Sequence, residues 1–334
     1  MKKLTALLLG AVLSTVSVFS IDLKGDLENK IDSFSKSMAG VLPFTATIGL
    51  NWSDAYIGNF PHFGVGLSGG FTAMNIDSFD ELLDLFGADT LLPSWLNLDT
   101  GILIPAYALE ARLGGLVLPF DIGVKFGYIP QEAKELLGEG IRFDYLTAGA
   151  EIRYALLKQN LILPNVSVGV GYNYLKGSIG MALPVSPGGF TIGINSISVL
   201  SPILDLLWET HSIDFNAQVS KSFLILTPYL GMGASYAKPR AGYKISAKLD
   251  DTVKDQLEDA GIDFDDSGFS AIKEADGWGY RAFGGLSFDL LLLRFDLTAL
   301  YSFGGDSEKI KNIFNGSADL DGNWGITFGI RCQL

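Results

Sequence analysis

An acidic stretch late in the chain has the residue spacing of a calcium-binding loop. Asp263, Asp265 and Ser267 supply oxygen atoms at alternate positions, Gly268 allows a sharp turn, and Glu274 closes a twelve-residue span. Calcium prefers oxygen ligands, and a closing carboxylate can bind it through both oxygen atoms. The surrounding segment is rich in acids throughout, so a solvated acidic loop predicts the same pattern. The cofactor prediction is therefore Ca²⁺ at this loop, with the solvated loop as its alternative.

The two histidines are the first place to look for catalysis. A hydrolase needs a base beside a nucleophile or an activated water. His62 lies in a predicted turn, and His211 precedes Ser212 in a predicted strand, so those two side chains point to opposite faces. The sequence contains no Walker loop, no Cys-x-x-Cys pair and no zinc-spaced histidine pair. We predict that the protein is not an enzyme and has no catalytic residues.

Full charges recur in the middle of segments that are otherwise half apolar. If the apolar series of each segment faces lipid, the charged series faces the interior of a barrel. In a soluble sandwich the same charges would lie on the solvated exterior, so the charges alone favour neither architecture. The candidates for the lumen are Glu110, Arg112, Lys125, Glu151, Arg153, Asp214, Arg281 and Asp296.

The elements that must position these charges alternate apolar and polar residues with a period of two, which is typical of β-strands. The last segment is the clearest: Trp324, Ile326, Phe328, Ile330, Cys332 and Leu334 form one apolar series. Aromatic residues gather near the segment ends, where a membrane interface would lie. Eleven such segments occur, at residues 44–52, 63–71, 107–113, 120–128, 146–154, 166–174, 213–219, 230–236, 280–288, 293–303 and 324–334.

The start of the chain reads as an export signal. Residues 1–20 combine two lysines, an apolar run and a small-residue cleavage site, which predicts a cleaved signal peptide. Hydrophobic residues make up 48% of the chain, yet after residue 20 no uncharged apolar run reaches the ~18 residues that a membrane helix needs. We predict an all-β transmembrane antiparallel barrel of about 12–14 strands over residues 44–334, with short helices in its long loops.

The odd number of alternating segments conflicts with this prediction, because single-chain bacterial barrels have even strand numbers. One explanation is a weak strand that the pattern hides, with residues 189–199 as the best candidate. The other is that residues 21–43, whose apolar residues have helical spacing, enter the lumen as a plug and reach the far side. A periplasmic or fraying helix is the third reading of residues 21–43.

The export signal, the alternating segments and the terminal apolar strand together resemble the bacterial outer-membrane β-barrel class, over residues 44–334. The chain departs from that class in ending on Leu334, where an aromatic residue is common. A lumenal N-terminal segment and apolar helical loops are similar to the FadL-type long-chain fatty acid channels. The class implies a Gram-negative-type envelope, the cell outer membrane as location, and its lipid and the barrel-assembly machinery as partners.

The resemblance implies passive uptake of small, hydrophobic solutes. A general diffusion porin is one alternative, with a weak cation preference because an acidic mouth attracts cations. A non-transporting structural or surface barrel is the other. Nucleic acid is excluded as a partner, because the formal net charge is −13 and phosphate binding needs basic patches.

Overall fold

The computed structural model describes residues 38, 40–55, 62–74, 97–98, 101–115, 119–129, 141–182, 189–192, 195–198, 203–246, 269–274, 276–304 and 323–334. Among these residues no helix combines the length and the apolarity needed to cross a bilayer. The described elements are almost all strands.

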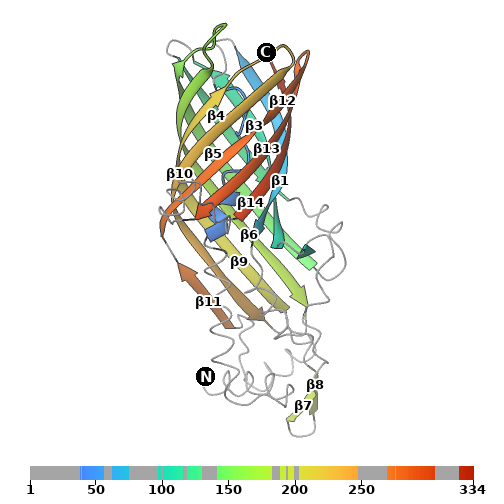
Figure 1. Ribbon diagram of the computed structural model, residues 1–334. Coiled ribbons are helices and arrows are strands. Elements are labelled where there is room, and N and C mark those ends of the chain that lie inside the picture. The colour runs from blue at the N-terminus through green and yellow to red at the C-terminus, as the bar shows by residue number, and fades with distance from the viewer. Residues whose placement is uncertain are drawn as a thin grey trace.

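Ten long strands close into one antiparallel barrel (Figure 1). Neighbours in sequence pair along the wall, and β1 pairs with both β3 and β14, which joins the ends of the sheet. The wall strands are β1 (Phe63–Met74), β3 (Gly101–Gly114), β4 (Phe120–Tyr128), β5 (Ile141–Leu157), β6 (Asn165–Ala182), β9 (Ile203–Ser220), β10 (Leu226–Ser246), β12 (Gly277–Leu290), β13 (Leu293–Gly304) and β14 (Asn323–Gln333).

Four shorter strands lie outside this closed wall. β2 (Asn97–Leu98) pairs with β3, and β11 (Phe269–Glu274) pairs with β10, which brings the barrel sheet to 12 strands. β7 (Gly189–Ile192) and β8 (Asn195–Ser198) form a separate two-stranded sheet. The predicted all-β antiparallel barrel is confirmed, and its closed wall has ten strands where about 12–14 were predicted. β7 and β8, which lie within the proposed hidden strand at residues 189–199, are not part of that wall.

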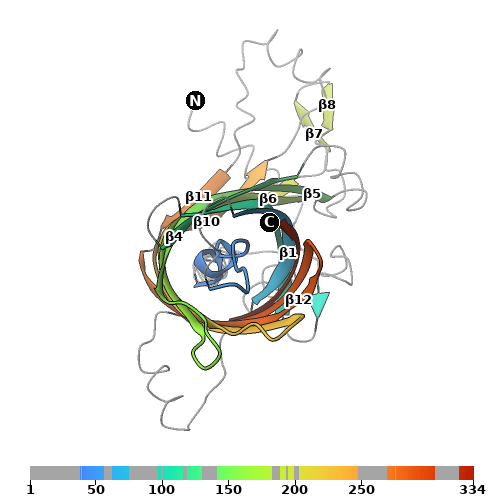
Figure 2. The same ribbon diagram turned by 90° about the horizontal axis from the view of Figure 1, so that it is seen from above.

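One predicted strand is wrong. Residues 44–52 do not join the wall but lie inside the barrel, where the blue coil is seen along the axis in Figure 2. Residues 40–45 are helical, and the amide of Ala46 donates to the carbonyl of Leu42 at 2.9 Å. Gly49 and Leu50 then take positive φ values of 89° and 64°, which an extended strand does not allow. The barrel therefore begins at β1, and the remaining predicted segments are even in number.

The outer surface of the wall is apolar. Leu109, Phe126 and Phe328 are 63%, 48% and 60% exposed, and the other outward positions of the alternating segments are similar. A soluble protein rarely leaves so continuous an apolar surface in water, whereas a barrel that faces hydrocarbon requires one. The closed barrel thus has the exterior of a membrane-spanning one.

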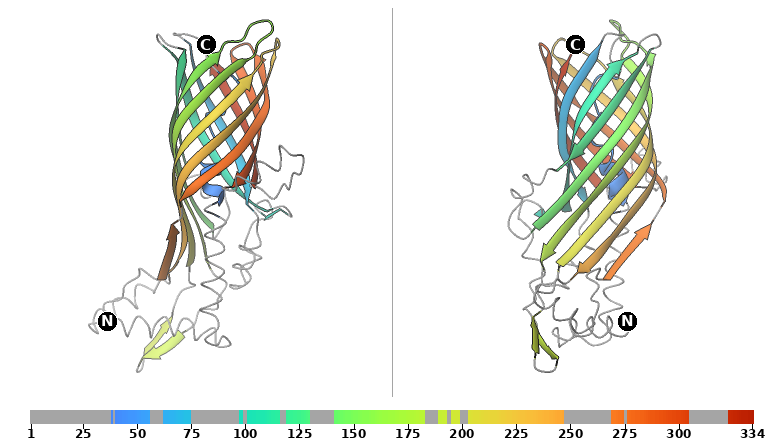
Figure 3. Two further views of the ribbon diagram at one scale, coloured as in Figure 1. Left: turned by 60° about the vertical axis from the view of Figure 1, so that its left-hand side comes forward. Right: turned by 180° about the vertical axis from the view of Figure 1, so that it is seen from behind.

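The barrel has two different ends. Short turns join the strands at the end where the C-terminus lies (Figure 1), and we call this the turn end. At the opposite end, the loop end, β5, β6, β9 and β10 continue well past the other strands as a curved sheet, with β11 at its edge (Figure 3). We call this continuation the extension. Its outer face carries charged residues, among them Arg142, Asp144, Lys176, Lys238 and Arg240, which is typical of a surface in water.

Candidate functional site: the lumen and the segment inside it

The lumen holds residues 40–55, which we call the lumenal segment. Most of its residues are buried, including Leu42, Ile48 and Trp52, each no more than 2% exposed. The segment enters from the loop end, passes along the barrel and reaches the turn end, where β1 begins (Figures 1 and 2). The polar contacts within the lumen join this segment to the inner face of the wall or pair two wall residues behind it.

The eight charged residues predicted for the lumen are all placed on the inner side of the wall. Seven of them are at least nine-tenths buried: Glu110, Arg112, Lys125, Arg153, Asp214, Arg281 and Asp296. The side chain of Glu151 is 12% exposed. Strand register places Glu110 opposite Lys125, because residues directly opposite in an antiparallel pair lie side by side on one face. Arg281 instead reaches Asp214 across the intervening strand β10.

A network around Asp121 occupies one side of the lumen. Arg153 binds the carboxylate of Asp121 with two contacts, Nε to Oδ1 at 3.0 Å and Nη2 to Oδ2 at 2.8 Å. Arg112 pairs with Asp121 and with Glu151. The two guanidinium groups then reach the lumenal segment, since Arg112 donates to the carbonyl of Leu50 at 3.1 Å and Arg153 to that of Asp54 at 2.7 Å.

Trp52 is the centre of the contacts that hold the segment. Its indole Nε1 donates to Oε2 of Glu110 at 3.0 Å, and the amide of Leu50 donates to the same carboxylate oxygen. The guanidinium of Arg331 lies over its ring, 4.6 Å from the centroid, and that of Arg112 lies 5.6 Å away. The attraction between a cation and an aromatic face is strongest where water is excluded. Trp52 is therefore held by a hydrogen bond from its indole nitrogen and by the two guanidinium groups over its ring.

Two wall side chains donate hydrogen bonds to backbone carbonyls of the lumenal segment that accept none from a strand or helix. Lys125 Nζ donates to the carbonyls of Ala46 and Ile48, both at 2.6 Å. Gln218 Nε2 donates to the carbonyls of Trp52 and Ser53 at 2.8 and 2.9 Å. Buried backbone carbonyls need such partners, because a buried polar group without one destabilises the fold.

Asp54 fixes the end of the segment at the turn end of the barrel. Its carboxylate pairs with Arg294 and lies 3.3 Å from Nη2 of Arg331. Arg331 also contacts Asp296 at 3.0 Å. The amide of Ala55 donates to the hydroxyl of Ser220 at 3.0 Å. The segment is thus anchored from four strands, namely β5, β9, β13 and β14.

Nearer the loop end the contacts around Phe44 are apolar, and a cavity lies beside them. Phe44 packs with Tyr229, Phe283 and Leu300 in a buried cluster. A cavity of about 230 Å³ lies beside Gly40, Pro43 and Phe44 and reaches Ser235 and Arg281 on the wall. Arg281 is paired with Asp214, Nη2 to Oδ2 at 2.7 Å. This cavity is space that the lumenal segment leaves unfilled.

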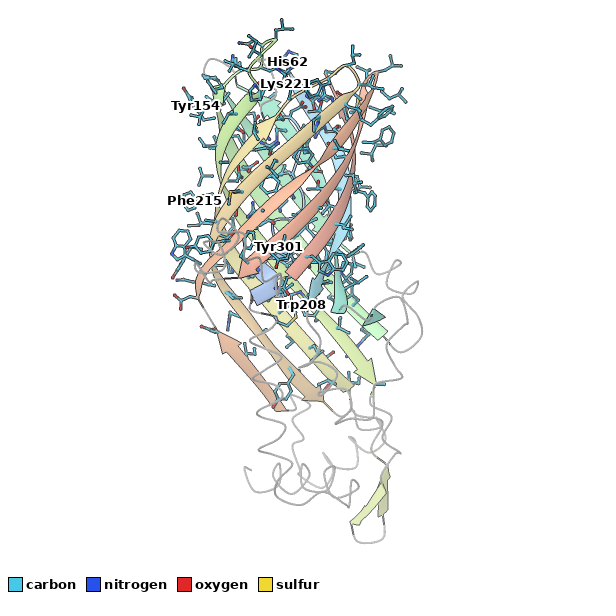
Figure 4. The ribbon with its side chains drawn as sticks, viewed as in Figure 1. His62, Tyr154, Trp208, Phe215, Lys221 and Tyr301 are labelled. Carbon is cyan, nitrogen blue, oxygen red and sulfur yellow. The ribbon has the colours of Figure 1, made fainter. Side chains whose placement is uncertain are left out.

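The inner face of the barrel is polar within the closed wall and apolar in the extension. In the extension the inward positions are apolar and buried: Phe143, Tyr145, Leu175, Leu204, Leu206, Trp208 and Tyr243. Gly177 makes room for the indole of Trp208, whose ring atoms lie 2.7 Å from where a Cβ would be. Figure 4 shows Trp208 below the closed wall, on the loop-end side of the lumen.

One row of polar atoms crosses this apolar face. Trp208 Nε1, Thr210 Oγ1 and Ser212 Oγ follow one another along the inner face of β9, and among the described residues they have no hydrogen-bond partner. All three side chains are at least nine-tenths buried. The row leads along β9 from the extension toward the lumen.

Neither histidine faces the lumen. His62 lies at the turn end (Figure 4), with Nδ1 2.9 Å from the carbonyl oxygen of Leu334. His211 is on the outer face, 2.6 Å from the hydroxyl of Tyr172. Of the predicted calcium ligands, Asp263, Asp265 and Ser267 lie outside the described residues. Glu274 is in β11 and pairs with Arg240 at 2.8 Å. Most of residues 21–43, the predicted plug, also lies outside them.

Several residues that hold the segment are absent from the sequence-based candidates. Asp121, Arg294 and Arg331 stand in the polar series of their strands, so the same alternation that selects Lys125 would have selected them. Trp52, Asp54 and Gln218 are different. Trp52 and Asp54 act from a segment that the pattern assigns to the wall or its edge, and Gln218 is uncharged.

Comparison with known proteins assigns no family to this chain. No family model matches the chain, and no curated protein matches it. Among solved structures, the outer membrane protease OmpT of Escherichia coli is 8% identical, with 82% of this chain and 97% of that one covered and a TM-score of 0.40. The translocator domain of the autotransporter NalP of Neisseria meningitidis is 9% identical (88% and 94% covered, TM-score 0.34). The Ralstonia pickettii toluene transporter TbuX is 11% identical (86% and 91% covered, TM-score 0.27).

Proposed function

We propose that this protein is an outer-membrane channel for the passive uptake of small hydrophobic solutes, and that the lumenal segment is its gate. The single observation that carries the proposal is the change in polarity along the inner face. An apolar, aromatic surface in the extension leads to a lumen whose charges are paired and whose space is filled by residues 40–55. The side chains of this apolar surface are buried, so an apolar solute binds there by displacing the groups that cover them, and its dispersion contacts with the same side chains stabilise it.

The row formed by Trp208, Thr210 and Ser212 narrows the proposed class of solute. Unpaired buried donors favour a molecule that brings an acceptor oxygen to them. The preferred solute is therefore apolar over most of its length and carries one small polar group. We do not propose a general diffusion porin, because the described lumenal acids are paired with bases or with the segment and attract no further cations.

A disulfide that crosslinks the lumenal segment to the wall tests whether movement of the segment is needed for uptake. The hydroxyls of Thr45 in the segment and Thr72 on β1 lie 2.6 Å apart, so cysteines at both positions are placed to form a disulfide. The native Cys332, which is exposed, is first replaced by Ser. Uptake of an apolar fluorescent fatty-acid analogue into phosphatidylcholine vesicles is then measured for the double variant, oxidised and reduced.

We expect the oxidised double variant to lose uptake and to regain it on reduction. The single variants Thr45→Cys and Thr72→Cys are matched controls, and the oxidant should leave their uptake unchanged. Uptake that persists with the disulfide formed would show that passage does not require the segment to move. No uptake by any variant, including the unmodified protein, would favour the second function below.

The second candidate function is a non-transporting structural barrel. The dense bonding of the lumenal segment favours it, because buried ion pairs and captured carbonyls must all be broken before the lumen opens. In that case the extension would be the surface that binds a partner.

A further inference from the structure

The short turns at the turn end expose large apolar side chains instead of polar ones. Leu161, Ile162, Leu224 and Leu291 are 97%, 85%, 101% and 97% exposed. They belong to three turns, at residues 158–164, 222–225 and 291–292, which together we call the turn rim. Turns in water are usually built from Gly, Asn, Asp, Pro and Ser, so an apolar rim needs an apolar environment.

Backbone conformation supports the same conclusion. Leu224 and Leu291 each stand first of the two central residues in a tight hairpin and have positive φ values of 53° and 57°. This is the position that a type II′ turn gives to Gly, because a side chain is disfavoured there. Both turns nevertheless hold Leu, and in both the second central residue is also a large aliphatic, Ile225 or Leu292.

The polar atoms of the rim are satisfied by one another. Lys221 Nζ donates to the carbonyls of Asn160, Leu161 and Leu163 in the neighbouring turn, at 2.8, 3.1 and 3.1 Å. The side-chain oxygen of Asn160 accepts from the amides of Ile162 and Leu163. Gln159 and Ser222 exchange two further hydrogen bonds. Internal pairing of backbone groups is required where water is scarce.

On β13 and β14 the apolar outer face is too short to cross the membrane unless the rim belongs to it. Tyr301 and Trp324 are paired on the outer face near the loop end, and Leu293 and Cys332 are paired eight residues further along the same two strands. Eight residues of a tilted strand cover about 20 Å along the membrane normal, whereas the apolar band of such barrels is ~25 Å tall. Leu291, Leu292 and Leu334 extend the belt by the missing length.

We infer that the turn rim is a lipid-binding surface, immersed at the boundary between acyl chains and headgroups of the membrane leaflet on the turn side. The rim continues the apolar exterior without a break, which makes lipid its natural occupant. The inference rests on the membrane insertion contained in the proposed function, but not on transport.

Nitroxide labels test the immersion. In a Cys332→Ser background, single cysteines are introduced as Leu161→Cys, Leu224→Cys and Leu291→Cys, labelled, and reconstituted into dioleoylphosphatidylcholine vesicles. Collision with oxygen, which concentrates among acyl chains, is compared with collision with a water-soluble nickel chelate. Leu109→Cys on the outer wall is the reference for lipid, and Lys238→Cys on the outer face of the extension is the reference for water.

We expect all three rim labels to show the oxygen preference of Leu109→Cys, several-fold above that of Lys238→Cys. Rim labels that resemble Lys238→Cys, while Leu109→Cys stays in lipid, would overturn the inference alone. A water-exposed label at Leu109→Cys would overturn membrane insertion and the proposed function. Rim labels shielded from both reagents and broadened by spin–spin coupling would show end-to-end contact between two copies and would also overturn the inference.

Discussion

At the scale of single residues, Trp52 shows how the lumen is kept closed. Its ring is 2% exposed, its Nε1 donates to Glu110, and the guanidiniums of Arg112 and Arg331 lie over it. No other residue of the lumenal segment has ring, edge and backbone contacts at once. Loss of this side chain leaves a cavity and removes one of the hydrogen bonds to the buried carboxylate of Glu110.

Trp52→Ala is therefore expected to destabilise the barrel by about 3–5 kcal/mol, the usual cost of removing a large buried aromatic side chain. Trp52→Phe keeps most of the volume but loses the hydrogen bond to Glu110, so a smaller loss of about 1–3 kcal/mol is expected. Urea unfolding in detergent, followed by circular dichroism, gives both values. Trp278→Ala, at a position 48% exposed on the outer face, is the matched control. Equal effects of Trp52→Ala and Trp278→Ala would contradict the role given to Trp52.

The second prediction for a single residue concerns the substitution of Lys125. Lys125→Met preserves the length of the buried side chain but removes the ammonium that binds the carbonyls of Ala46 and Ile48. Those carbonyls are then left unsatisfied, so residues near 46 should become more mobile and stability should fall by about 1–3 kcal/mol. A nitroxide at Ala46→Cys reports the mobility. Lys176→Met, at an exposed position of β6, is the control and should change neither quantity.

At the scale of elements, the alternating pattern predicts the wall and misreads the lumenal segment. Ten segments with a period of two are the ten wall strands, because each must present one face to an apolar exterior and one to a polar lumen. Residues 44–52 also alternate, yet both of their series are buried. A segment enclosed on all sides carries no constraint on its period, so its alternation predicts nothing about its conformation.

The residues that hold the lumenal segment are likewise predictable in part: the alternation indicates which wall charges face inward, but not which groups they contact. The charges of the wall are predictable, since a charge on the polar series of a barrel strand must face inward. Their partners are not predictable, because Arg112, Asp121 and Arg153 meet only through strand register. The contacts of Leu50 and Trp52 with Glu110 depend on the fold of a segment with no regular structure beyond residue 45.

The turns give a prediction at the scale of elements. Gly or Asn fits the positive φ of Leu224 and Leu291 with less strain, so Leu224→Gly combined with Leu291→Gly should relieve strain in detergent. In bilayers the same change removes two apolar side chains from lipid, at ~1.5–3 kcal/mol each. The double substitution should therefore lower the free energy of unfolding less in detergent micelles than in bilayers, and in micelles it could even raise it. An equal change in stability in micelles and bilayers would contradict the placement of the rim in lipid.

At the scale of the whole molecule, the barrel is built in three zones. A rim of apolar turns lies at one end, an apolar wall encloses paired charges in the middle, and an extension with an apolar inner face and a charged outer face lies at the other end. The two faces of the sheet exchange polarity where the extension begins. That exchange marks the level at which the wall leaves hydrocarbon for water.

The lumenal segment runs through the closed wall from the loop end to the turn end. Its removal tests most directly whether it closes the barrel. Ion conductance in planar bilayers is compared between the unmodified protein and a variant that lacks residues 40–55, after refolding of both has been confirmed by circular dichroism. We predict that the unmodified protein shows no steady open steps and that the shortened variant does. Steady open steps from the unmodified protein would contradict the claim that the segment closes the barrel.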